Sequence, residues 1–417
     1  MPNNWKTYKL GEIAKLRKKN ISPKDFNNEK YIGLEHIGQG SFLLDGLGIA
    51  SDANSNKSIF KSGDILYGKI RPYFKKVLRP KFSGICSTDI LVLNSKDEKL
   101  IDQGYLHQII KTQEFTDKAV ETSSGTKMPR ADWNSLEKLE FKLPSLQEQQ
   151  AIASILSAID DKIENNLAIN KTLEEMAMAL YKHWFVDFGP FQDGEFVESE
   201  LGMIPKGWGV DNIEHLLSVK PLNGLYKKSE FQGFGNRWLK MSSVYGLDII
   251  TNQKMELISV TDKEIEKFGC LRDDIVFGRT SLVLEGIGKC AIIKCGDNIP
   301  IFESNLFRIR LDKKKVFPDI IYHFFKSKYG RDEVKKLARQ TAAVSITSKD
   351  LTNIKLALPS VHVQKEVAEK FDFYINKQIN NIKENQTLTN LRDTLLPKLI
   401  SGDVRLKDFQ EQLATIL

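Results

Sequence analysis

The segment whose residue types come nearest to a known chemical site is 63–69, which has the pattern Gly-x4-Gly-Lys. This spacing resembles a phosphate-binding P-loop, in which a Ser or Thr must follow the Lys to bind Mg²⁺. Ile70 occupies that position and has no hydroxyl. The related segment 273–280 supplies Thr280, but it lacks the first Gly and carries Arg279 in place of the Lys. Each copy fails a different chemical requirement, so we predict no nucleotide site in either.

Other catalytic patterns are equally incomplete. Residues 231–235 match the Phe-x-Gly-x-Gly motif of S-adenosylmethionine methyltransferases, but they lie in a polar region and the chain has no Pro-Pro-aromatic motif. The acidic pair and lysine at 97–99 form a fragment that arises by chance in a chain with 28% charged residues. The six histidines show no metal-ligand spacing, and the four cysteines form no Cys-x-x-Cys pair. We therefore predict no catalytic residue, no cofactor and no metal.

Clusters of basic residues are the better candidates for a binding site. Arginine and lysine contact DNA phosphates and the edges of guanine bases, and the cluster after Gly68 is interleaved with Tyr73 and Phe74. For any one residue, an ordinary solvated surface position is the simpler interpretation. As a set they favour DNA binding: Lys69, Arg71, Lys75, Lys76, Arg79, Lys127, Arg130, Arg279, Thr280, Lys289 and Arg339.

The charge of the chain is divided sharply along its length. All 417 residues together carry a net charge of +7. Residues 1–145 carry +7 and residues 201–358 carry +8, whereas residues 146–200 carry −8 and residues 359–417 are neutral. Basic domains favour a polyanionic partner, and the acidic segment between them would be repelled by one. The acidic segment is therefore predicted to hold the basic domains or to bind protein.

Composition excludes several classes of protein. A hydrophobic content of 41% is that of a folded chain, and no apolar run is long enough to cross a membrane. The first residues do not form a signal peptide, so we expect no export. The lack of a disulfide pattern agrees with a reducing cytoplasm, which is the expected location.

The elements that must position the basic clusters come from an internal duplication. Residues 143–185 recur at 358–400 with a constant offset of 215, and twelve of the 43 positions are identical. After the opening Leu-Pro-Ser, neither copy has a Pro or Gly before Pro397, and apolar residues follow a 4-3 spacing. This pattern predicts two long helices with a coiled-coil seam, each roughly 60 Å long.

The seam turns polar near the middle of both helices. If the helices lie antiparallel, Asn166 and Asn170 face Asn381 and Asn385. A buried asparagine layer costs stability but fixes the register of two helices. Exposure of these four residues to water is the alternative, and the sequence does not choose between the two.

The duplication extends over the whole chain, which alternates a globular segment with a long helix. Each globular segment has strand-like runs followed by a helical pattern, at 105–120 and at 320–337. Because these helices do not alternate with strands, the fold class is α+β, with two pseudo-symmetric and mostly antiparallel domains separated by two long antiparallel helices. The predicted parts are a first domain at 1–145, a helix at 146–187, a linker and second domain at 188–357, a helix at 358–400 and a C-terminal tail at 401–417.

The chain resembles a known family, the specificity subunit of type I restriction–modification enzymes. The resemblance rests on the Leu-Pro-Ser-Leu-x-Glu-Gln entry at 143–149 and on the long helix after each domain. It also rests on the Gly-Asp-Ile-Leu segment 63–66, on its counterpart 274–276, and on residues 395–402 near the end of the second helix. The resemblance covers essentially the whole chain.

The resemblance implies a function and a set of partners. In that family each globular part is a target recognition domain that binds half of a split DNA site. The paired helices set the gap between the half-sites and bind two modification subunits, which carry the methyltransferase chemistry. With restriction subunits added, the complex cuts DNA in an ATP-dependent reaction. The family's DNA-contacting residues cannot be carried over one by one, so our candidates rest on charge and loop position alone.

Protein partners are expected on the acidic helices. Met176, Met178 and Trp184 are plausible contacts there, although core packing explains these three residues equally well. Two rival functions remain. One is a stand-alone methyltransferase or nuclease, which the missing catalytic motif disfavours. The other is a protein-interaction scaffold with no DNA role.

Overall fold

A computed structural model describes residues 5–22, 25, 29–52, 54–125, 127–296, 298–340 and 343–405. The chain divides into two compact units: Met1–Asn165 with Thr387–Leu417, and Asn166–Gln386. Most of the C-terminal tail predicted at 401–417 lies outside the described residues. Over the described ranges, no helix combines the length and the apolar character needed to cross a membrane.

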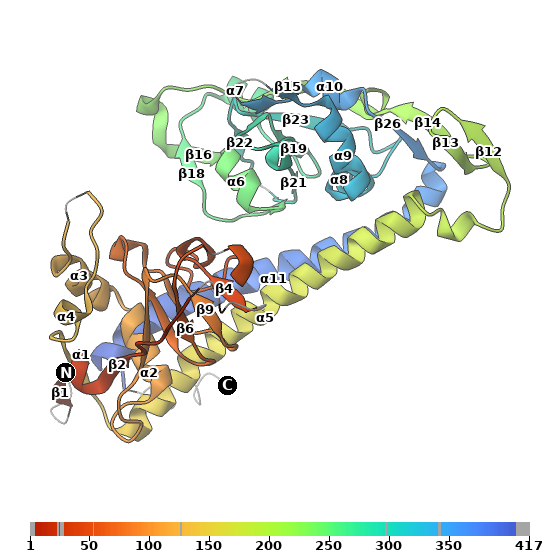
Figure 1. The fold of residues 1–417 in the computed structure, drawn as a ribbon. Helices are drawn as coiled ribbons and strands as arrows, with labels where there is room; N and C mark the ends of the chain where they lie inside the picture. Colours follow the sequence, from red (N-terminus) through yellow and green to blue (C-terminus); the bar gives the residue numbers. More distant parts are fainter. Residues whose placement is uncertain are drawn as a thin grey trace, which may run out of the picture. The chain divides into compact units, whose positions relative to one another are not determined.

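The first unit combines small sheets with helices (Figure 1). Its sheets have the strand orders β2-β10-β7-β8, β3-β6-β9-β4-β5 and β1-β11. The elements are β1 (Lys6–Lys9), α1 (Leu10–Ile13), β2 (Ala14–Leu16), β3 (Asn20–Ile21), β4 (Lys30–Ile32), β5 (Gly48–Ile49), β6 (Lys57–Phe60), β7 (Ile65–Gly68), β8 (Val77–Leu78), β9 (Gly84–Cys86), β10 (Ile90–Ser95), α2 (Gln103–Lys111), α3 (Gln113–Glu121), α4 (Trp133–Leu136) and β11 (Glu140–Leu143).

The second unit follows a similar plan. Its main sheet has the order β15-β23-β19-β21-β17, beside β18-β16-β22, β20-β25-β24, β14-β26 and β12-β13. The elements are β12 (Phe196–Ser199), β13 (Gly202–Pro205), β14 (Gly209–Asn212), β15 (Leu217–Asn223), β16 (Gln232–Leu239), α6 (Met241–Gly246), β17 (Ile249–Ile250), β18 (Glu256–Ile258), α7 (Asp262–Phe268), β19 (Ile275–Gly278), β20 (Thr280–Ser281), β21 (Cys290–Ile293), β22 (Ile301–Phe302), β23 (Leu306–Leu311), α8 (Pro318–Lys326), α9 (Lys328–Leu337), β24 (Arg339–Gln340), β25 (Val344–Ser345), α10 (Ser348–Thr352) and β26 (Lys355–Leu358).

The two units repeat one sequence of elements, which confirms the predicted fold class. The antiparallel pair β7 and β10 corresponds to β19 and β23, and the closing pair β1 and β11 corresponds to β14 and β26. The helix pair α2 and α3 corresponds to α8 and α9. Most strand pairs are antiparallel, but β4 and β9, β16 and β22, and β17 and β21 pair in parallel.

The helical patterns predicted at 105–120 and 320–337 are each two helices rather than one. α2 is followed by Thr112 and α8 by Ser327, where ψ is 155° and 156°. Each hydroxyl accepts a hydrogen bond from a backbone N–H of the next helix, Phe115 N at 3.1 Å and Gly330 N at 3.1 Å. A side chain that caps the following helix in this way fixes a break that the apolar periodicity alone does not reveal.

The two long helices are α5 (Leu146–Phe185) and α11 (Val361–Ser401), and each unit contains part of both. In the first unit, Asp160 of α5 lies 3.4 Å from Arg392 of α11, and Glu148 lies 3.7 Å from Arg405 just beyond α11. Residue numbers fall on one helix as they rise on the other, so the segments run antiparallel, as predicted (Figure 1).

Each unit has its own apolar core along the helices. In the first unit Ile152, Leu156, Ile159 and Ile163 of α5 are buried with Leu395 and Leu399 of α11. In the second unit the buried residues of α11 are Val367, Phe371, Ile375 and Ile379. Ile375 and Ile379 therefore form this part of the seam, and Tyr374 packs beside them only half buried.

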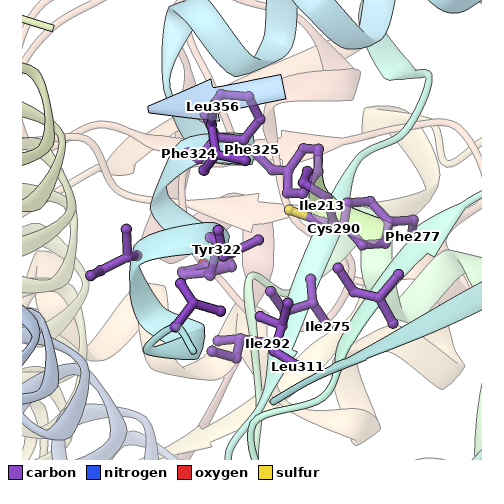
Figure 2. Close-up of a cluster of buried hydrophobic side chains, with 14 of the residues drawn as sticks. Ile213, Ile275, Phe277, Cys290, Ile292, Leu311, Tyr322, Phe324, Phe325 and Leu356 are labelled. Atoms are coloured by element: carbon purple, nitrogen blue, oxygen red, sulfur yellow. The ribbon is translucent and has the colours of Figure 1, made fainter. Parts of the chain in front are cut away.

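The domain part of the second unit is also densely packed. Figure 2 shows side chains of β19, β21 and α8 gathered in one cluster. The ring centroids of Phe277 and Phe325 are 4.8 Å apart, and Cys290 is buried beside them. This core fixes the end of β19, from which the candidate binding residues of the second domain extend.

Candidate nucleic-acid interface

Two segments that carry candidate residues meet in the first unit. We call residues 69–76 and 123–130 the first loop pair; Thr126 lies outside the described residues. Arg71 N donates to the carbonyl oxygen of Pro129 at 2.8 Å, and Ala131 N donates to that of Lys69 at 2.9 Å. The backbone thus joins segments that are more than fifty residues apart and places their basic residues together.

The first segment of this pair has an unusual backbone. Arg71 and Lys75 have positive φ angles of 51° and 48° and flank the short 3-10 helix η4 (Pro72–Phe74). Residues with a Cβ rarely adopt this conformation, and it persists only where the surroundings impose it. The turn leaves Tyr73 at its apex with 48% of its surface exposed. Strained and exposed residues beside basic ones are typical of a binding loop.

The cations of the first loop pair differ in how free they are. Lys127 is exposed, and Arg130 is exposed while lying 3.2 Å from Asp89. Lys69, Arg71 and Lys75 are half-buried. Lys76 donates to the carbonyl oxygen of Leu34, and burial lowers the pKa of its amine.

Arg79 lies with the long helix and not with the loops. Its Nε donates to the carbonyl oxygen of Gly63 at 3.3 Å, and the side chain lines a pocket of about 230 Å³ with Asp160, Asp161 and Glu164 of α5. The neighbouring Lys81 donates to Asp161 at 2.7 Å and to Glu164 at 2.9 Å. Carboxylates at these distances compete with DNA phosphates for Lys81.

The second unit has a matching second loop pair, which we define as residues 279–289 and 339–345, where 341 and 342 lie outside the described residues. β20 pairs with β25, and β25 with β24. Ile346 N donates to the carbonyl oxygen of Arg279 at 3.0 Å. The loop after β19 therefore meets the segment before α10, just as the loop after β7 meets the segment before α4.

Several candidate residues in the second loop pair are engaged by other groups of the second unit. Arg279 donates to the carbonyl oxygen of Ser304 at 2.9 Å, and Lys289 donates to that of Tyr245 at 2.7 Å. The hydroxyl of Thr280 lies 3.8 Å from the sulfur of Met241. Arg339 is exposed and lies 3.2 Å from Asp350. Of these four, Arg339 has the side chain most accessible to a ligand.

The segment Gly63-Asp64-Ile65 and its counterpart Asp273-Asp274-Ile275 each form a structural turn before a central strand. Asp64 accepts from Arg17 at 2.6 Å and from Lys61 N at 2.8 Å, and Asp274 accepts from Arg310 and from Leu271 N, both at 2.7 Å. Both aspartates are buried. The backbone N–H of Gly63 donates to the carbonyl oxygen of Pro80, so the turn is committed to internal hydrogen bonds.

Two lysines at the domain–helix contact, Lys111 buried and Lys326 half-buried, were not predicted. Lys111 lies 2.5 Å from Asp160 of α5, and Lys326 lies 2.7 Å from Glu174 of α5 and 2.8 Å from Asp248. Burial lowers the pKa of Lys111; in Lys326 the attraction of Asp248 and Glu174 outweighs burial and raises the pKa. The two lysines are 215 residues apart, the offset of the duplication, so the repeat itself contained the signal.

The structure brings the four predicted asparagines together. Asn166 Nδ2 donates to Asn385 Oδ1 and to Glu384 Oε2, both at 2.8 Å. Asn381 Nδ2 donates to Asn170 Oδ1 at 2.8 Å. Asn166 is only 1% exposed, so this layer is buried on that side. Whether the layer fixes the register stays a prediction.

The three predicted partner contacts have different surroundings. Met176 is 45% exposed, and Met178 lines an apolar groove with Tyr181 and Tyr329. Trp184 is 4% exposed and packs in the core of the second unit. Trp184 therefore has the core position that the sequence left open, while the two methionines remain accessible on α5.

Comparison with known proteins defines the class of the chain. The model of the type I restriction modification DNA specificity domain matches residues 2–175 and again residues 205–390. The chain belongs to this family, as the resemblance of its motifs predicted.

Three similar proteins illustrate the match. The MjaIX specificity subunit of a type I restriction enzyme from Methanocaldococcus jannaschii is 26% identical, over 93% of this chain and 87% of that protein. The MjaVIII specificity subunit from the same organism is 27% identical, over 98% and 95% of the two chains. The crystal structure of the S subunit of a type I restriction–modification system from M. genitalium matches 96% of this chain and 97% of that one, with a TM-score of 0.56 and 16% identity.

Proposed function

We propose that the chain is the DNA-recognition subunit of a type I restriction–modification complex. Residues 1–145 and the domain within 188–357 each bind one half of a bipartite site. The helices at 146–187 and 358–400 hold these domains and bind two modification subunits, with restriction subunits joining some complexes. The chain itself is non-catalytic, and methyl transfer belongs to the modification subunits.

One observation carries this proposal. The family model matches twice, and in each match an equivalent strand, β7 or β19, leads into a loop pair that carries basic residues. Two similar but non-identical basic surfaces suit a split and asymmetric duplex site. The relatives are named as specificity subunits, which supports the same role here.

The proposal is tested by exchanging one domain. The chain and its modification subunits are expressed together, and methylated positions are mapped on genomic DNA. Residues 1–145 are then replaced by the matching segment of a relative. We expect one half of the methylated site to change while the other half and the gap stay the same. An unchanged site would favour the scaffold without a DNA role.

Catalysis by the chain itself is a separate question with its own assay. The purified chain is incubated with DNA and radiolabelled S-adenosylmethionine, with and without modification subunits. We expect label on DNA only in the mixture. Label transferred by the chain alone would show that it is a methyltransferase in its own right.

The helix surface that binds the modification subunits is proposed to include Met176 and Met178. Replacing both by Asp adds charge to an apolar groove and should reduce co-purification of those subunits. Val197, 39% exposed on β12, is the matched control, and Val197→Asp should leave co-purification unchanged. If the methionine variant recovers the modification subunits as well as the wild type does, their binding surface lies elsewhere on the chain.

A further inference from the structure

The most exposed large apolar side chain among the described residues is in the second loop pair. Leu282 is 94% exposed, and the adjacent Val283 is 57% exposed. Both lie between β20 and the short 3-10 helix η8 (Leu284–Gly286). Leaving two branched apolar side chains in water forgoes the free energy of burying them. Such exposure in a folded domain points to a ligand that covers it.

The loop that carries these residues is held firmly at its base. The hydroxyl of Tyr245 lies within hydrogen-bond distance of two carbonyl oxygens, those of Thr280 at 2.9 Å and Gly286 at 2.8 Å. Arg331 donates to the carbonyl oxygens of Glu285 at 2.8 Å and Ile287 at 2.7 Å. A pre-positioned tip loses less conformational entropy when it binds. The exposure of Leu282 is therefore part of a built feature.

The surroundings of the tip favour DNA as the ligand. Leu282 lies in the same loop as Arg279 and Lys289, in a segment, 201–358, whose net charge is +8. The equivalent loop of the first unit presents Tyr73, 48% exposed, between Arg71 and Lys75. Both domains thus place an exposed apolar residue within their basic loop pair, at the loop after the equivalent strand.

We propose that Leu282 and Val283 contact thymine methyl groups in the half-site that the second domain binds. The C5-methyl of thymine is the apolar group that a base pair displays in the major groove. Consecutive residues of an extended segment point to opposite sides, so the tip is apolar on two sides, which suits a groove more than the gap between stacked base pairs. This inference rests on the proposed function and makes Leu282 a residue that determines specificity.

The test uses the full-length chain with the modification subunits that co-purify with it. A random pool of 40-base-pair duplexes is selected for binding. The selected duplex is then made in a series of versions, each with uracil in place of one thymine of the second half-site. The affinities of the wild type and of Leu282→Ala are measured on the selected duplex and on each uracil version. Leu271→Ala is the control, because Leu271 is 46% exposed and precedes β19 at its other end.

We expect Leu282→Ala to weaken binding to the selected duplex by about tenfold. Uracil at one position should weaken the wild type by a similar factor and leave Leu282→Ala unaffected, while Leu271→Ala behaves as wild type. Thymine contact is refuted if Leu282→Ala binds the selected duplex and every uracil version more weakly than the wild type by the same factor. It is also refuted if Leu282→Ala binds the selected duplex as tightly as the wild type does. A half-site without thymine refutes it too. If the wild type selects no sequence, the proposed function itself fails.

Discussion

At the scale of single residues, one glutamine attaches each domain to its long helix, and the two glutamines do so in the same way. Gln149 Oε1 accepts from Asp102 N at 3.0 Å, and its amide donates to the carbonyl oxygens of Leu100 and Pro144 at 3.1 and 3.0 Å. Gln364, which is 215 residues further along, accepts from Phe317 N at 3.3 Å and donates to the carbonyl oxygens of Lys315 and Pro359 at 3.2 and 3.0 Å.

Replacing either glutamine should destabilise its own unit. Gln149→Leu leaves three backbone groups without their side-chain partner, one in a buried hydrogen bond and two in part-buried ones. We expect a loss of about 3 kcal/mol in the free energy of unfolding. Gln150→Leu is the control, because Gln150 is exposed on the same helix turn. Urea unfolding followed by fluorescence measures both. Equal midpoints for the two variants would mean that these hydrogen bonds do not hold the domain.

His323 should make stability depend on pH. Burial lowers the pKa of His323 to about 3, and its ring stacks on Phe371 of α11 with centroids 4.1 Å apart. In the unfolded chain a histidine binds a proton near pH 6.5, whereas the folded His323 stays neutral. Folding is therefore favoured above pH 6.5, and stability falls by about 1.4 kcal/mol per pH unit between pH 6.5 and 3 from this residue.

The matched variant is His323→Gln, since Gln108 stands at the equivalent position of the first unit. Its urea midpoint should fall less between pH 7 and pH 4.5 than that of the wild type. Part of the dependence should remain, because burial also lowers the pKa of His107. An identical pH dependence in the two proteins would show that His323 titrates normally in the folded chain.

At the scale of elements, the asparagine layer should control the register of α5 and α11. Asn166→Leu with Asn385→Leu replaces a polar layer by an apolar one, which tolerates several alignments. We expect the melting temperature to stay the same or rise, while cross-linking between engineered cysteine pairs along the two helices shows more than one register. The four native cysteines among the described residues are buried, so they do not interfere. A single unchanged register would refute this role.

How much of each element could be predicted depends on where its contacts come from. The long helices and the repeated domains followed from periodicity and from the offset of 215, because these signals are local or repeated. The breaks at Thr112 and Ser327 depend on side-chain caps, and the sequence does not reveal them because Thr and Ser also occur inside helices. The exposure of Leu282 depends on Tyr245 and Arg331, which are far away in the sequence.

The candidate site was predictable only in outline. Charge indicated loops that the structure joins into pairs, and their role in DNA binding stays a prediction. Charge could not separate exposed Lys127 from Arg279, whose guanidinium is engaged by the carbonyl oxygen of Ser304. Lys294 also follows β19 in the sequence, but it is 5% exposed and lies 2.8 Å from Asp273 and 2.7 Å from Asp319. Long-range ion pairs of this kind leave no local pattern.

At the scale of the whole molecule, DNA binding should depend strongly on salt. Each lysine that neutralises a phosphate releases a counterion, so removing one should reduce the slope of log affinity against log salt by about 1. Lys127→Ala should show this reduction. Lys81→Ala is the control, because Asp161 and Glu164 engage Lys81 and raise its pKa. Fluorescence anisotropy between 50 and 200 mM salt on one duplex is the measurement. Equal slopes for both variants would place Lys127 away from the phosphates.

The hydrogen bonds of Gln149 and Gln364 to their domains have a genetic consequence. Both glutamines form these hydrogen bonds with main-chain atoms, so the bonds depend on the path of the backbone and not on the identity of the side chains along it. A domain of quite different sequence can pack on the same helix if its backbone follows the same path at these hydrogen bonds. If the domains bind DNA as proposed, one recombination event at the Leu-Pro-Ser junction would exchange a domain and change the DNA site without any change in the long helices.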